Sequence, residues 1–508
     1  MKRIIYKLSM VAVLISLMAT SCTKDFEKTN TDPNGSPTAL PEQLLPPALV
    51  GVMGYMQIRN RNFNNELMQV TVSQTDAEGS VFRYDFRSNW ADYLYNGLYT
   101  ELTNFKDVYR YAGNDKDSMT YKGISLICQS WIYSVLTDTY GDVPYSQSNL
   151  AKEEGIFEPA FDRQKDIYLS IFQKLEEANA ALTGTGAVNL VKTYGDPVYN
   201  GSALLWRKFG NSLYLRLLLR VAHKTDVGAQ AQAKIKEILE TKVSTYPLIA
   251  SVTESAVLKW TGAGPYVSPL MTVRAQDFTA PGVGKFFIDH LVSWNDPRID
   301  IPTWGGGTAN RFRIAPYQGA YLGIPSGYAV GENPPKRSYF YATPSLTLMN
   351  DPMTGLIFPY AEIRFIKAEC IVKGYISSTT GAESDYNAGV QAGIQYWLPS
   401  WTTVPVIDYL TAADIQWDDT YTLDQKMEMI HLQKYYALFL VDMQQWFEYR
   451  RTGHPVLPKG GGLRNNGVMP ARMTYPIYVQ STNPTNYKLA VAAQGPDVIS
   501  TQVWWQQP

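Results

Sequence analysis

Apolar residues recur every three or four positions along most of this chain, a spacing that predicts α-helices. The helical patterns come in neighbouring pairs, and short polar turns such as Gly113-Asn114-Asp115 join them. Paired helices of this kind are typical of α-α repeat architectures, although no fixed sequence period accompanies them here. With their capping residues, the predicted helices span 44–58, 63–74, 90–111, 118–140, 162–182, 202–217, 362–375, 385–397 and 422–449.

Polar residues mark three of the predicted helix starts. Asp162 and Ser202 each precede an apolar helical pattern, where a side-chain oxygen can accept a hydrogen bond from a free N–H of the first turn. Thr422 and Gln425 have the spacing of a capping box, in which the two side chains and backbone N–H groups pair reciprocally. We therefore expect all three positions to be N-caps.

A long stretch without helical period, about 246–359, separates the second and third helix pairs. Loops of that length inside a compact chain are usually functional or disordered. This stretch is rich in aromatic residues and glycines, above all from Trp294 to Tyr341, which argues against disorder. We interpret it as an ordered insertion that presents flat side chains around a binding surface.

The first residues are typical of an export signal. Lys2, Arg3 and Lys7 precede an apolar stretch that is too short to cross a hydrocarbon core of about 30 Å as a helix. Small residues then run into Cys22, which predicts a signal peptide at 1–21, lipidation of Cys22 and a polar tether over 22–41. The alternative is ordinary secretion, with the cysteine a chance neighbour of the cleavage site. The other cysteines, Cys128 and Cys370, lie in apolar helical patterns and are expected to be core thiols.

Charge and aromatic content narrow the choice of ligand. Once the basic residues of the signal peptide are removed, acidic residues outnumber basic ones, which argues against a nucleic-acid partner. The chain holds 35 Tyr and 12 Trp but only 18 Phe. Tyrosine and tryptophan combine an apolar face with a polar group, so many of them are expected to touch ligands or partners.

Signatures of catalysis are missing from the sequence. The four histidines form no His-Glu-x-x-His pair or Cys/His cluster, and no P-loop or nucleotide-binding glycine motif follows a strand pattern. We therefore expect no metal and no cofactor, although a calcium site built from scattered carboxylates stays open. The glycine triplet at 460–462 is interpreted as a flexible loop.

Two other classes of function compete with a binding protein. A helical glycoside hydrolase needs only two suitably spaced carboxylates, which no motif announces. Its candidates lie near aromatic residues and are Asp76, Glu78, Asp85 and Asp92. A purely structural scaffold would fit the helix pairs but would leave the aromatic insertion unexplained.

Seven motifs in order along the chain are similar to SusD/RagB nutrient-binding lipoproteins. No single one is specific, but their succession over nearly the whole length is. They are Asn30–Asn34, Tyr140–Tyr145, Ala361–Glu369, Gln433–Tyr435, Trp446–Gly453, Pro470–Pro476 and Trp504-Trp505.

The resemblance implies an all-α fold: a single domain over 42–508 with about four tetratricopeptide-like helix pairs, whose loops form the ligand site. It implies a binding protein, not an enzyme, that captures glycans or peptides and delivers them to a SusC-like TonB-dependent barrel. It also implies a position at the outer membrane, facing the cell exterior. The acidic residues Asp25 and Glu27 resemble the signal that sends such lipoproteins to the outer face. We interpret the motifs as scaffold: Gly141 relieves backbone strain, and Arg364, Glu369, Arg450 and Arg451 form ion pairs between helices.

The ligand site is therefore sought outside the motifs. Aromatic faces stack on sugar rings, and arginine donates a fork of hydrogen bonds to hydroxyls or peptide carbonyls. Two patches combine these residue types, and we expect the loop from Trp304 to Tyr321 to supply more ligand contact than any helix-pair surface. Beside Phe82, the candidate ligand-binding residues are Arg83, Tyr84, Trp90, Trp304, Arg311, Tyr317 and Tyr321.

Overall fold

The computed structural model describes residues 39–75, 79–114, 116–184, 196–299, 310–377, 381–402 and 404–507. The chain consists of two units, Met1–Leu40 and Pro41–Pro508, and the second is described below. The predicted signal peptide, Cys22 and Trp304 lie outside the described residues, as do Asp76 and Glu78.

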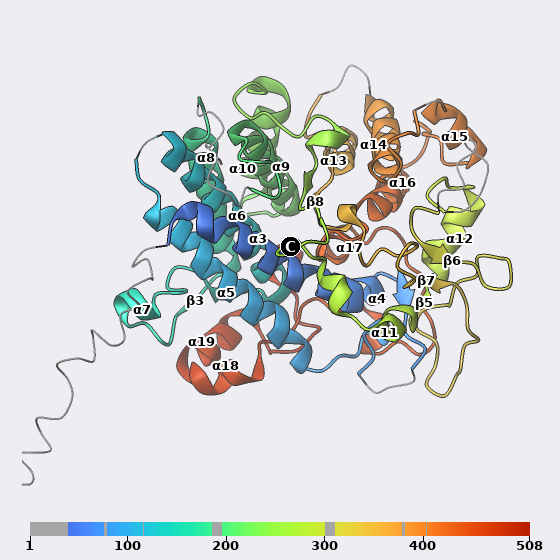
Figure 1. Cartoon of the computed structure of the whole chain (residues 1–508), viewed down its shortest axis with the longest axis horizontal. Coiled ribbons are helices and arrows are strands. Elements are labelled where there is room, and N and C mark those ends of the chain that lie inside the picture. The colour runs from blue at the N-terminus through green and yellow to red at the C-terminus, as the bar shows by residue number, and fades with distance from the viewer. Residues whose placement is uncertain are drawn as a thin grey trace, which may run out of the picture. The chain divides into compact units, whose positions relative to one another are not determined.

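Long helices that follow one another in the chain also pack on one another in space. α5 packs on α6 and α6 on α8, α8 contacts α9, and α13 packs on both α14 and α16. In Figure 1 these helices follow an arc around α17, from α5 and α6 at the left to α14 and α16 at the upper right. The predicted all-α fold with tetratricopeptide-like helix pairs is confirmed. The long helices are α3 (Pro41–Arg59), α5 (Asn89–Tyr111), α6 (Lys116–Tyr140), α8 (Gln164–Ala181), α9 (Ala203–Val221), α13 (Tyr360–Val372), α14 (Gly381–Trp397) and α16 (Leu423–Ala437).

Shorter elements fill the connections. The remaining α-helices are α4 (Asn65–Leu67), α7 (Ala151–Glu154), α10 (Gly228–Lys236), α11 (Ala275–Thr279), α12 (Lys285–Ser293), α15 (Val406–Ala412), α17 (Gln444–Thr452), α18 (Ile477–Thr482) and α19 (Pro484–Gln494). Single turns of 3-10 or π-helix are η1 (Asn60–Asn64), η2 (Val81–Arg83), η3 (Glu237–Thr241), η4 (Val252–Glu254), η5 (Pro269–Thr272), η6 (Pro352–Thr354), η7 (Asn465–Gly467) and η8 (Trp504–Gln506).

Short strands fasten distant loops to one another as two-stranded antiparallel pairs. The pairs are β1 (Thr71–Val72) with β5 (Gly282–Val283), β2 (Val143–Pro144) with β3 (Phe161–Asp162), β4 (Ala256–Val257) with β8 (Leu356–Phe358), and β6 (Ile314–Ala315) with β7 (Tyr339–Phe340). Three of these pairs lie wholly or partly in the irregular stretch predicted for 246–359, whose described part contains only short elements.

Two of the three predicted N-caps are confirmed. The Ser202 side chain accepts a hydrogen bond from the Leu205 N–H, and Thr422 and Gln425 form the complete capping box. The prediction for Asp162 is wrong, because this residue lies in β3 and its carboxylate accepts hydrogen bonds from Tyr145 N–H and Ser146 N–H, both at 2.9 Å.

Two predicted helices end early. The helix expected over 63–74 is a π-turn and one short turn that ends at Leu67, after which Thr71 begins β1. The helix expected to run from Thr422 to Tyr449 stops at Ala437 and restarts at Gln444 as α17. Leu440 and Asp442 in the interruption have positive φ values of 70° and 22°, which a helix cannot accommodate.

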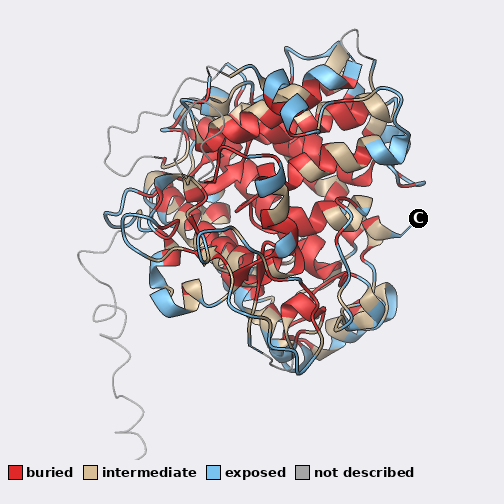
Figure 2. Ribbon diagram, turned by 90° about the vertical axis from the view of Figure 1, so that its right-hand side faces the viewer, coloured by how far each residue is buried: buried red, intermediate tan, exposed pale blue. Residues whose placement is uncertain are grey.

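One hydrophobic core extends from the helix pairs into the loops. Figure 2 shows buried residues filling the helices, whereas exposed residues gather on the outer loops. Cys128 and Cys370 are buried and free, as predicted. Within the described residues, no helix has both the length and the apolarity that a membrane crossing requires.

Candidate functional site

Three parts of the chain far apart in sequence form one assembly of loops: 68–75 with 79–87, 310–342 and 456–468. Backbone hydrogen bonds join them, from Arg464 N–H to Arg83 O at 2.7 Å and from Gly462 N–H to Gly327 O at 2.8 Å. The assembly has a small core of its own, made of Val72, Phe82, Ile324 and Tyr328. We call these segments the loop assembly.

Arg83 and Tyr84, two of the predicted ligand residues, are buried inside the loop assembly. The Arg83 guanidinium lies 4.8 Å from the ring centres of both Phe82 and Tyr328, and its Nε donates to Tyr328 O at 2.9 Å. Tyr84 is 2% exposed, with a left-handed φ of 61° and a pKa that burial raises. Neither side chain reaches the surface in this packing, so ligand contact by them stays a prediction that the packing does not favour.

Trp90 lies in the first turn of α5 and is half-buried. Its ring is 4.9 Å from the Arg59 guanidinium and 5.9 Å from the Phe63 ring. Two of its neighbours therefore belong to the α3–η1 region, and only part of the ring is open to a ligand.

The described residues of the second predicted patch are partly buried or already take part in contacts within the protein. The Arg311 guanidinium pairs with both carboxylate oxygens of Asp351 and lies 5.1 Å from the centre of the Trp397 ring, so its charge is already neutralised. Tyr317 closes a tight turn by exchanging backbone hydrogen bonds with Ala320. Tyr317 and Tyr321 are both half-buried.

Two tyrosines that the sequence analysis missed stand at β7. Along 337–341 half-buried and buried residues alternate, so Arg337, Tyr339 and Tyr341 share one side of the strand while Ser338 and Phe340 point inward. The Tyr339 and Tyr341 ring centres are 6.1 Å apart. The same alternation is visible in the sequence, where Arg337, Tyr339 and Tyr341 alternate with Ser338 and Phe340. This pattern could have predicted the site.

One basic side chain and one backbone contact flank this tyrosine pair. The Lys336 ammonium lies 5.5 Å from the Tyr339 ring centre, and the backbone of Arg313 on the neighbouring chain segment accepts a hydrogen bond from Tyr341 N–H at 2.8 Å. The pair therefore offers flat aromatic faces beside hydrogen-bond donors, the combination that suits a sugar ring.

A groove of about 470 Å³ opens between α12 and the loop assembly, a size within the usual range for small-molecule sites. Its walls are both polar and apolar: Gln69, Lys285, Phe286, Asp289, His290, Pro325, Ser326, Pro458, Lys459 and Gly460. His290 stacks on Trp294 with ring centres 5.2 Å apart, and burial lowers the pKa of its imidazole. The groove can thus hold a hydroxyl-rich ligand without requiring one of a given charge.

The groove and the tyrosine pair are connected by residues 321–326. Leu322 N–H donates to Ser338 Oγ at 3.1 Å, which places Leu322 beside the start of β7. Three residues further along, Pro325 lines the groove. Both features therefore belong to one continuous part of the loop assembly.

The glycine triplet is a packing site and not the flexible loop that we expected. A Cβ on Gly460 would lie 2.2 Å from Gly327 O, and a Cβ on Gly462 would lie 2.1 Å from Tyr328 O. These two glycines let two loops of the assembly approach each other, and Gly460 also lines the groove.

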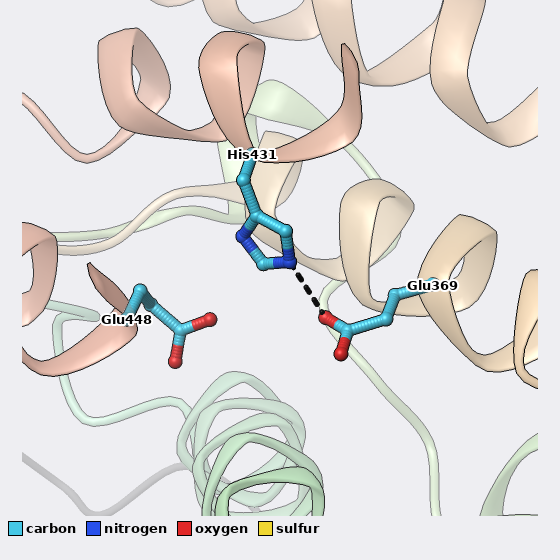
Figure 3. A group of neighbouring side chains, drawn as sticks. All are labelled: Glu369, His431 and Glu448. Atoms are coloured by element: carbon cyan, nitrogen blue, oxygen red, sulfur yellow. Dashed lines mark ion pairs between the residues drawn. The ribbon is translucent and has the colours of Figure 1, made fainter. Parts of the chain in front are cut away.

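A possible metal site lies elsewhere, at the helix junction. Glu369, His431 and Glu448 are buried, and their ligand atoms lie within 4.8 Å of one another (Figure 3). His431 Nε2 is 3.2 Å from Glu369 Oε2, and burial lowers the pKa of His431 to about 4. An uncharged imidazole between two carboxylates would suit a cation.

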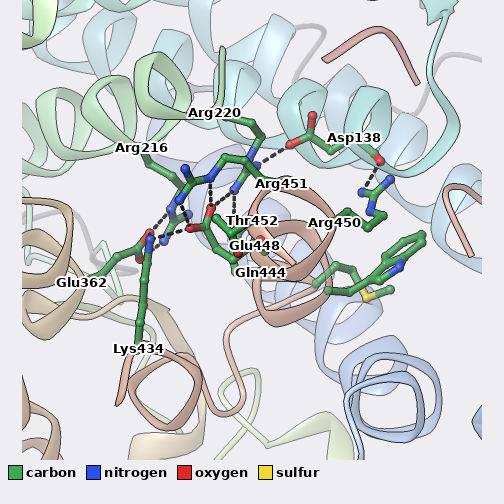
Figure 4. A network of polar contacts seen from close by, with 12 residues as sticks. Asp138, Arg216, Arg220, Glu362, Lys434, Gln444, Glu448, Arg450, Arg451 and Thr452 are labelled. Carbon is green, nitrogen blue, oxygen red and sulfur yellow. Dashed lines mark hydrogen bonds and ion pairs between the residues drawn. The ribbon is translucent and has the colours of Figure 1, made fainter. Parts of the chain in front are cut away.

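Protein cations already occupy that position. Arg451 donates to Glu369 at 2.6 and 2.8 Å and to Glu448 at 2.7 Å, and Lys434 reaches Glu448 at 2.7 Å. Figure 4 shows Arg451, Lys434 and Glu448 as part of a larger network. The carboxylates are neutralised without a metal, so this cluster is a structural junction.

Three of the family motifs, Ala361–Glu369, Gln433–Tyr435 and Trp446–Gly453, supply residues to this network, as interpreted from the sequence. Arg364 pairs with Asp385 at 3.0 Å, and Glu369 pairs with Arg451. Arg450 differs from the expectation: its guanidinium donates to backbone carbonyls, among them Asp138 O at 2.6 Å, and lies 4.0 Å from the centre of the Trp446 ring. Burial lowers the pKa of Arg450 to about 9.

A motif turn confirms the interpretation of Gly141. Its φ is +85°, and a Cβ there would lie 1.8 Å from Gln494 Oε1. Any other residue at this position would strain the backbone and push aside the Gln494 side chain.

Comparisons with known proteins agree on one group. A family model described as starch-binding and associating with the outer membrane matches residues 33–476. A SusD homolog from Bacteroides fragilis is 21% identical, with 92% of this chain and 100% of that chain covered at a TM-score of 0.74. A chitin-binding SusD homolog from Flavobacterium johnsoniae is 19% identical, with 91% and 98% covered at a TM-score of 0.73. No curated protein matches the sequence significantly.

Proposed function

This chain belongs to the SusD-like family, and from that premise we propose that it is a glycan-binding protein of the cell surface. The resemblance of the seven motifs to this family is thereby confirmed. The observation that carries the proposal is the pair Tyr339 and Tyr341, which stands beside Lys336 in a loop assembly that also encloses a groove. The description of the family and the name of the Flavobacterium relative both support a glycan ligand.

Binding, and not turnover, is the activity that we propose. The family is described by what it binds, and the structural relatives are named as binding proteins or SusD homologs. Of the carboxylates that a hydrolase would need, Asp85 and Asp92 are described, and both are half-buried. Asp92 lies in the first turn of α5, where burial raises its pKa.

The cellular role rests on the family resemblance. We propose that the bound glycan, or a peptide, is passed to a SusC-like TonB-dependent barrel in the outer membrane. Lipidation of Cys22 would hold the protein at that membrane, facing the exterior, and 22–41 would give it reach. The description of the family as associating with the outer membrane supports this location.

The test is calorimetric titration with starch and chitin oligosaccharides. Removing a central aromatic ring from a binding site typically costs at least about 2 kcal/mol, roughly 30-fold in affinity. Tyr339→Ala and Tyr341→Ala are therefore expected to weaken binding by about that factor, without lowering the melting temperature, since both rings are half-buried at most. Trp304→Ala and Tyr317→Ala are titrated in the same way, and they test the loop that the sequence analysis predicted to contact the ligand.

A matched control is Tyr478→Ala. Tyr478 is 39% exposed on α18, which lies away from the β6–β7 region in Figure 1. Equal loss of affinity in this control, or full affinity in both β7 variants, would place the site elsewhere. Recovery of shortened oligosaccharides, abolished by Asp85→Asn or Asp92→Asn, would support the hydrolase instead.

A further inference from the structure

A second pocket lies on the helical scaffold, where the faces of three helices converge. It has a volume of about 500 Å³. α5 contributes Lys106, Tyr109 and Arg110 at i, i+3 and i+4 spacing, so these side chains lie on one face of that helix. α6 and α8 supply the facing walls. Their lining residues are Lys122, Leu126 and Gln129 on α6 and Lys174 and Glu177 on α8.

The lining of this pocket is strongly basic. Four of its side chains carry positive charge, and Glu177 is the one acidic side chain among the lining residues. The Glu177 carboxylate accepts a hydrogen bond from the Tyr109 hydroxyl at 3.0 Å and not from a lysine. Arg110 is neutralised outside the pocket, by Glu153 at 2.5 Å and Asp107 at 3.1 Å.

None of the three lysines forms such an ion pair with a described residue, although the nearby Glu177 carboxylate partly offsets the burial that lowers the pKa of Lys174. Lys106 donates to Ser148 O at 2.6 Å and to Ser148 Oγ at 3.1 Å, both uncharged acceptors. Lys122 donates to the Asn114 side chain at 3.0 Å, and Lys174 lies 6.0 Å from the Tyr145 ring centre. Among the described residues, no carboxylate comes within ion-pair distance of any of the three.

Gathering these lysines has an electrostatic cost. All three are partly buried, and burial lowers the pKa of Lys174. Burial, together with repulsion from Lys174 and Arg110, lowers the pKa of Lys106 to about 8. Like charges at partly desolvated positions destabilise the folded chain unless an anion joins them. The same chain neutralises other lysines with carboxylates, such as Lys208 with Glu254, and the cluster in this pocket differs from them in that respect.

We propose that this pocket binds a tetrahedral oxyanion, a phosphate or sulfate group, carried by a sugar-sized molecule. Ammonium groups donate charge-assisted hydrogen bonds to such oxygens, and the volume exceeds what an inorganic ion alone would fill. Tyr109 and Gln129 add neutral groups beside the lysines for the organic part. The group could come from a soluble sugar ester or from a lipid headgroup at the membrane surface.

This site does not depend on the proposed glycan site. α5, α6 and α8 lie at the left of Figure 1, whereas β6, β7 and α12 lie at the right. The two pockets share no lining residue. Binding at one can therefore be tested while the other is intact.

The experiment uses the mature chain at low ionic strength, titrated with glucose 6-phosphate, inorganic sulfate and neutral glucose. We expect glucose 6-phosphate to bind saturably and glucose not to bind this pocket. Lys174→Gln should weaken the phosphate ester about tenfold, because it removes one charge-assisted contact. Lys122→Gln, on another wall, is a second variant in case the first does not fold, which its circular dichroism will report.

Lys488→Gln is the matched control, because Lys488 is an exposed lysine on α19 outside the pocket. A second arm measures sedimentation of the Cys22→Ala chain, which carries no lipid of its own, with phosphatidylcholine vesicles that do or do not contain phosphatidylglycerol. Binding only to the anionic vesicles, lost in Lys174→Gln, would support the site with a lipid headgroup as its ligand. No saturable binding in either arm, or the same loss in Lys488→Gln as in Lys174→Gln, would overturn the proposal.

Discussion

At the scale of single residues, buried charged side chains at the helix junction pair directly with side chains of opposite charge. Arg216 meets Glu362 through two contacts, Nε to Oε1 at 2.7 Å and NH2 to Oε2 at 2.5 Å, with both side chains at most 1% exposed. Arg220 pairs with Asp138 at 2.5 Å and with Glu448 at 3.1 Å. Because these residues come from α6, α9, α13 and α17, the network fixes how those helices meet (Figure 4).

The substitution Glu362→Gln tests whether the network of ion pairs fixes how these helices meet. It keeps the shape of the side chain but leaves the buried Arg216 charge without its carboxylate. Removing one partner of a buried ion pair typically costs about 3–5 kcal/mol, so the free energy of unfolding in urea should fall by that amount. Arg274→Gln, in the exposed pair with Asp277, should leave it close to unchanged. Similar small effects in both variants would mean that the junction is stabilised by packing alone.

The sequence did not show which way individual side chains of the predicted site point. Aromatic and arginine content drew attention to Arg83 and Tyr84, but the type of a residue does not show where its side chain points, and both are buried. The positive φ of Tyr84 belongs to a turn that buries both side chains, and nothing in the sequence announces it. Tyr339 and Tyr341 could have been found, because a strand alternates its sides at every residue and the polar-aromatic alternation over 337–341 is visible in the sequence.

At the scale of elements, long amphipathic helices were predictable and their interruptions were not. The bounds of α5 and α6 agree within two residues with the apolar pattern. The run Leu438–Val441 looks helical, yet it forms a buried turn in which Asp442 accepts hydrogen bonds from Gln444 Nε2 at 2.9 Å and Trp131 Nε1 at 3.3 Å. Tertiary contacts of that kind override local propensity, and a single sequence does not show them.

The start of α8 is a second case, and it yields a test. Sequence position favoured Asp162 as its cap, but the Asp142 carboxylate accepts the hydrogen bond from Gln164 N–H at 2.8 Å and pairs with Arg163 at 2.9 Å. A capping oxygen contributes about 1 kcal/mol. Asp142→Ala should therefore lower the free energy of unfolding by about that amount and speed hydrogen exchange in peptides from the start of α8.

The matched variant is Asp162→Ala, whose carboxylate holds the turn at Tyr145 and Ser146 instead. Faster exchange should then appear in peptides covering that turn, with α8 still protected. If Asp162→Ala exposes the start of α8 and Asp142→Ala does not, the cap is the residue that the sequence first suggested.

At the scale of the whole molecule, the main hydrophobic core reaches from the scaffold into the loops, in addition to the small core of the loop assembly, so the loops are not independent appendages. Phe312, from the insertion, packs edge-on against Phe439 at 5.1 Å and against Trp397 at 5.5 Å. The described motifs Ala361–Glu369, Gln433–Tyr435 and Trp446–Gly453 lie on or directly beside α13, α16 and α17, where packing and ion pairs restrict the choice of residue. The ligand surface that we propose lies on loops, where outward side chains have fewer packing partners. Family and fold could therefore be predicted from the sequence, whereas most of the proposed ligand residues were missed.

The last prediction concerns how the molecule is held in place. Cys22 follows a short basic and apolar leader, and we propose that it carries lipid. Each buried CH₂ of an acyl chain contributes about 0.8 kcal/mol, so one chain binds a bilayer only reversibly, whereas two or more hold a protein stably. Cys22→Ala should therefore move the protein from the membrane pellet to the soluble fraction and abolish incorporation of labelled palmitate. Ser21→Ala keeps the cysteine and should leave both unchanged. The partner barrel could hold the unlipidated protein, so the fractionation belongs in cells that lack it, and a Cys22→Ala chain that still sediments with their membranes would refute the anchor.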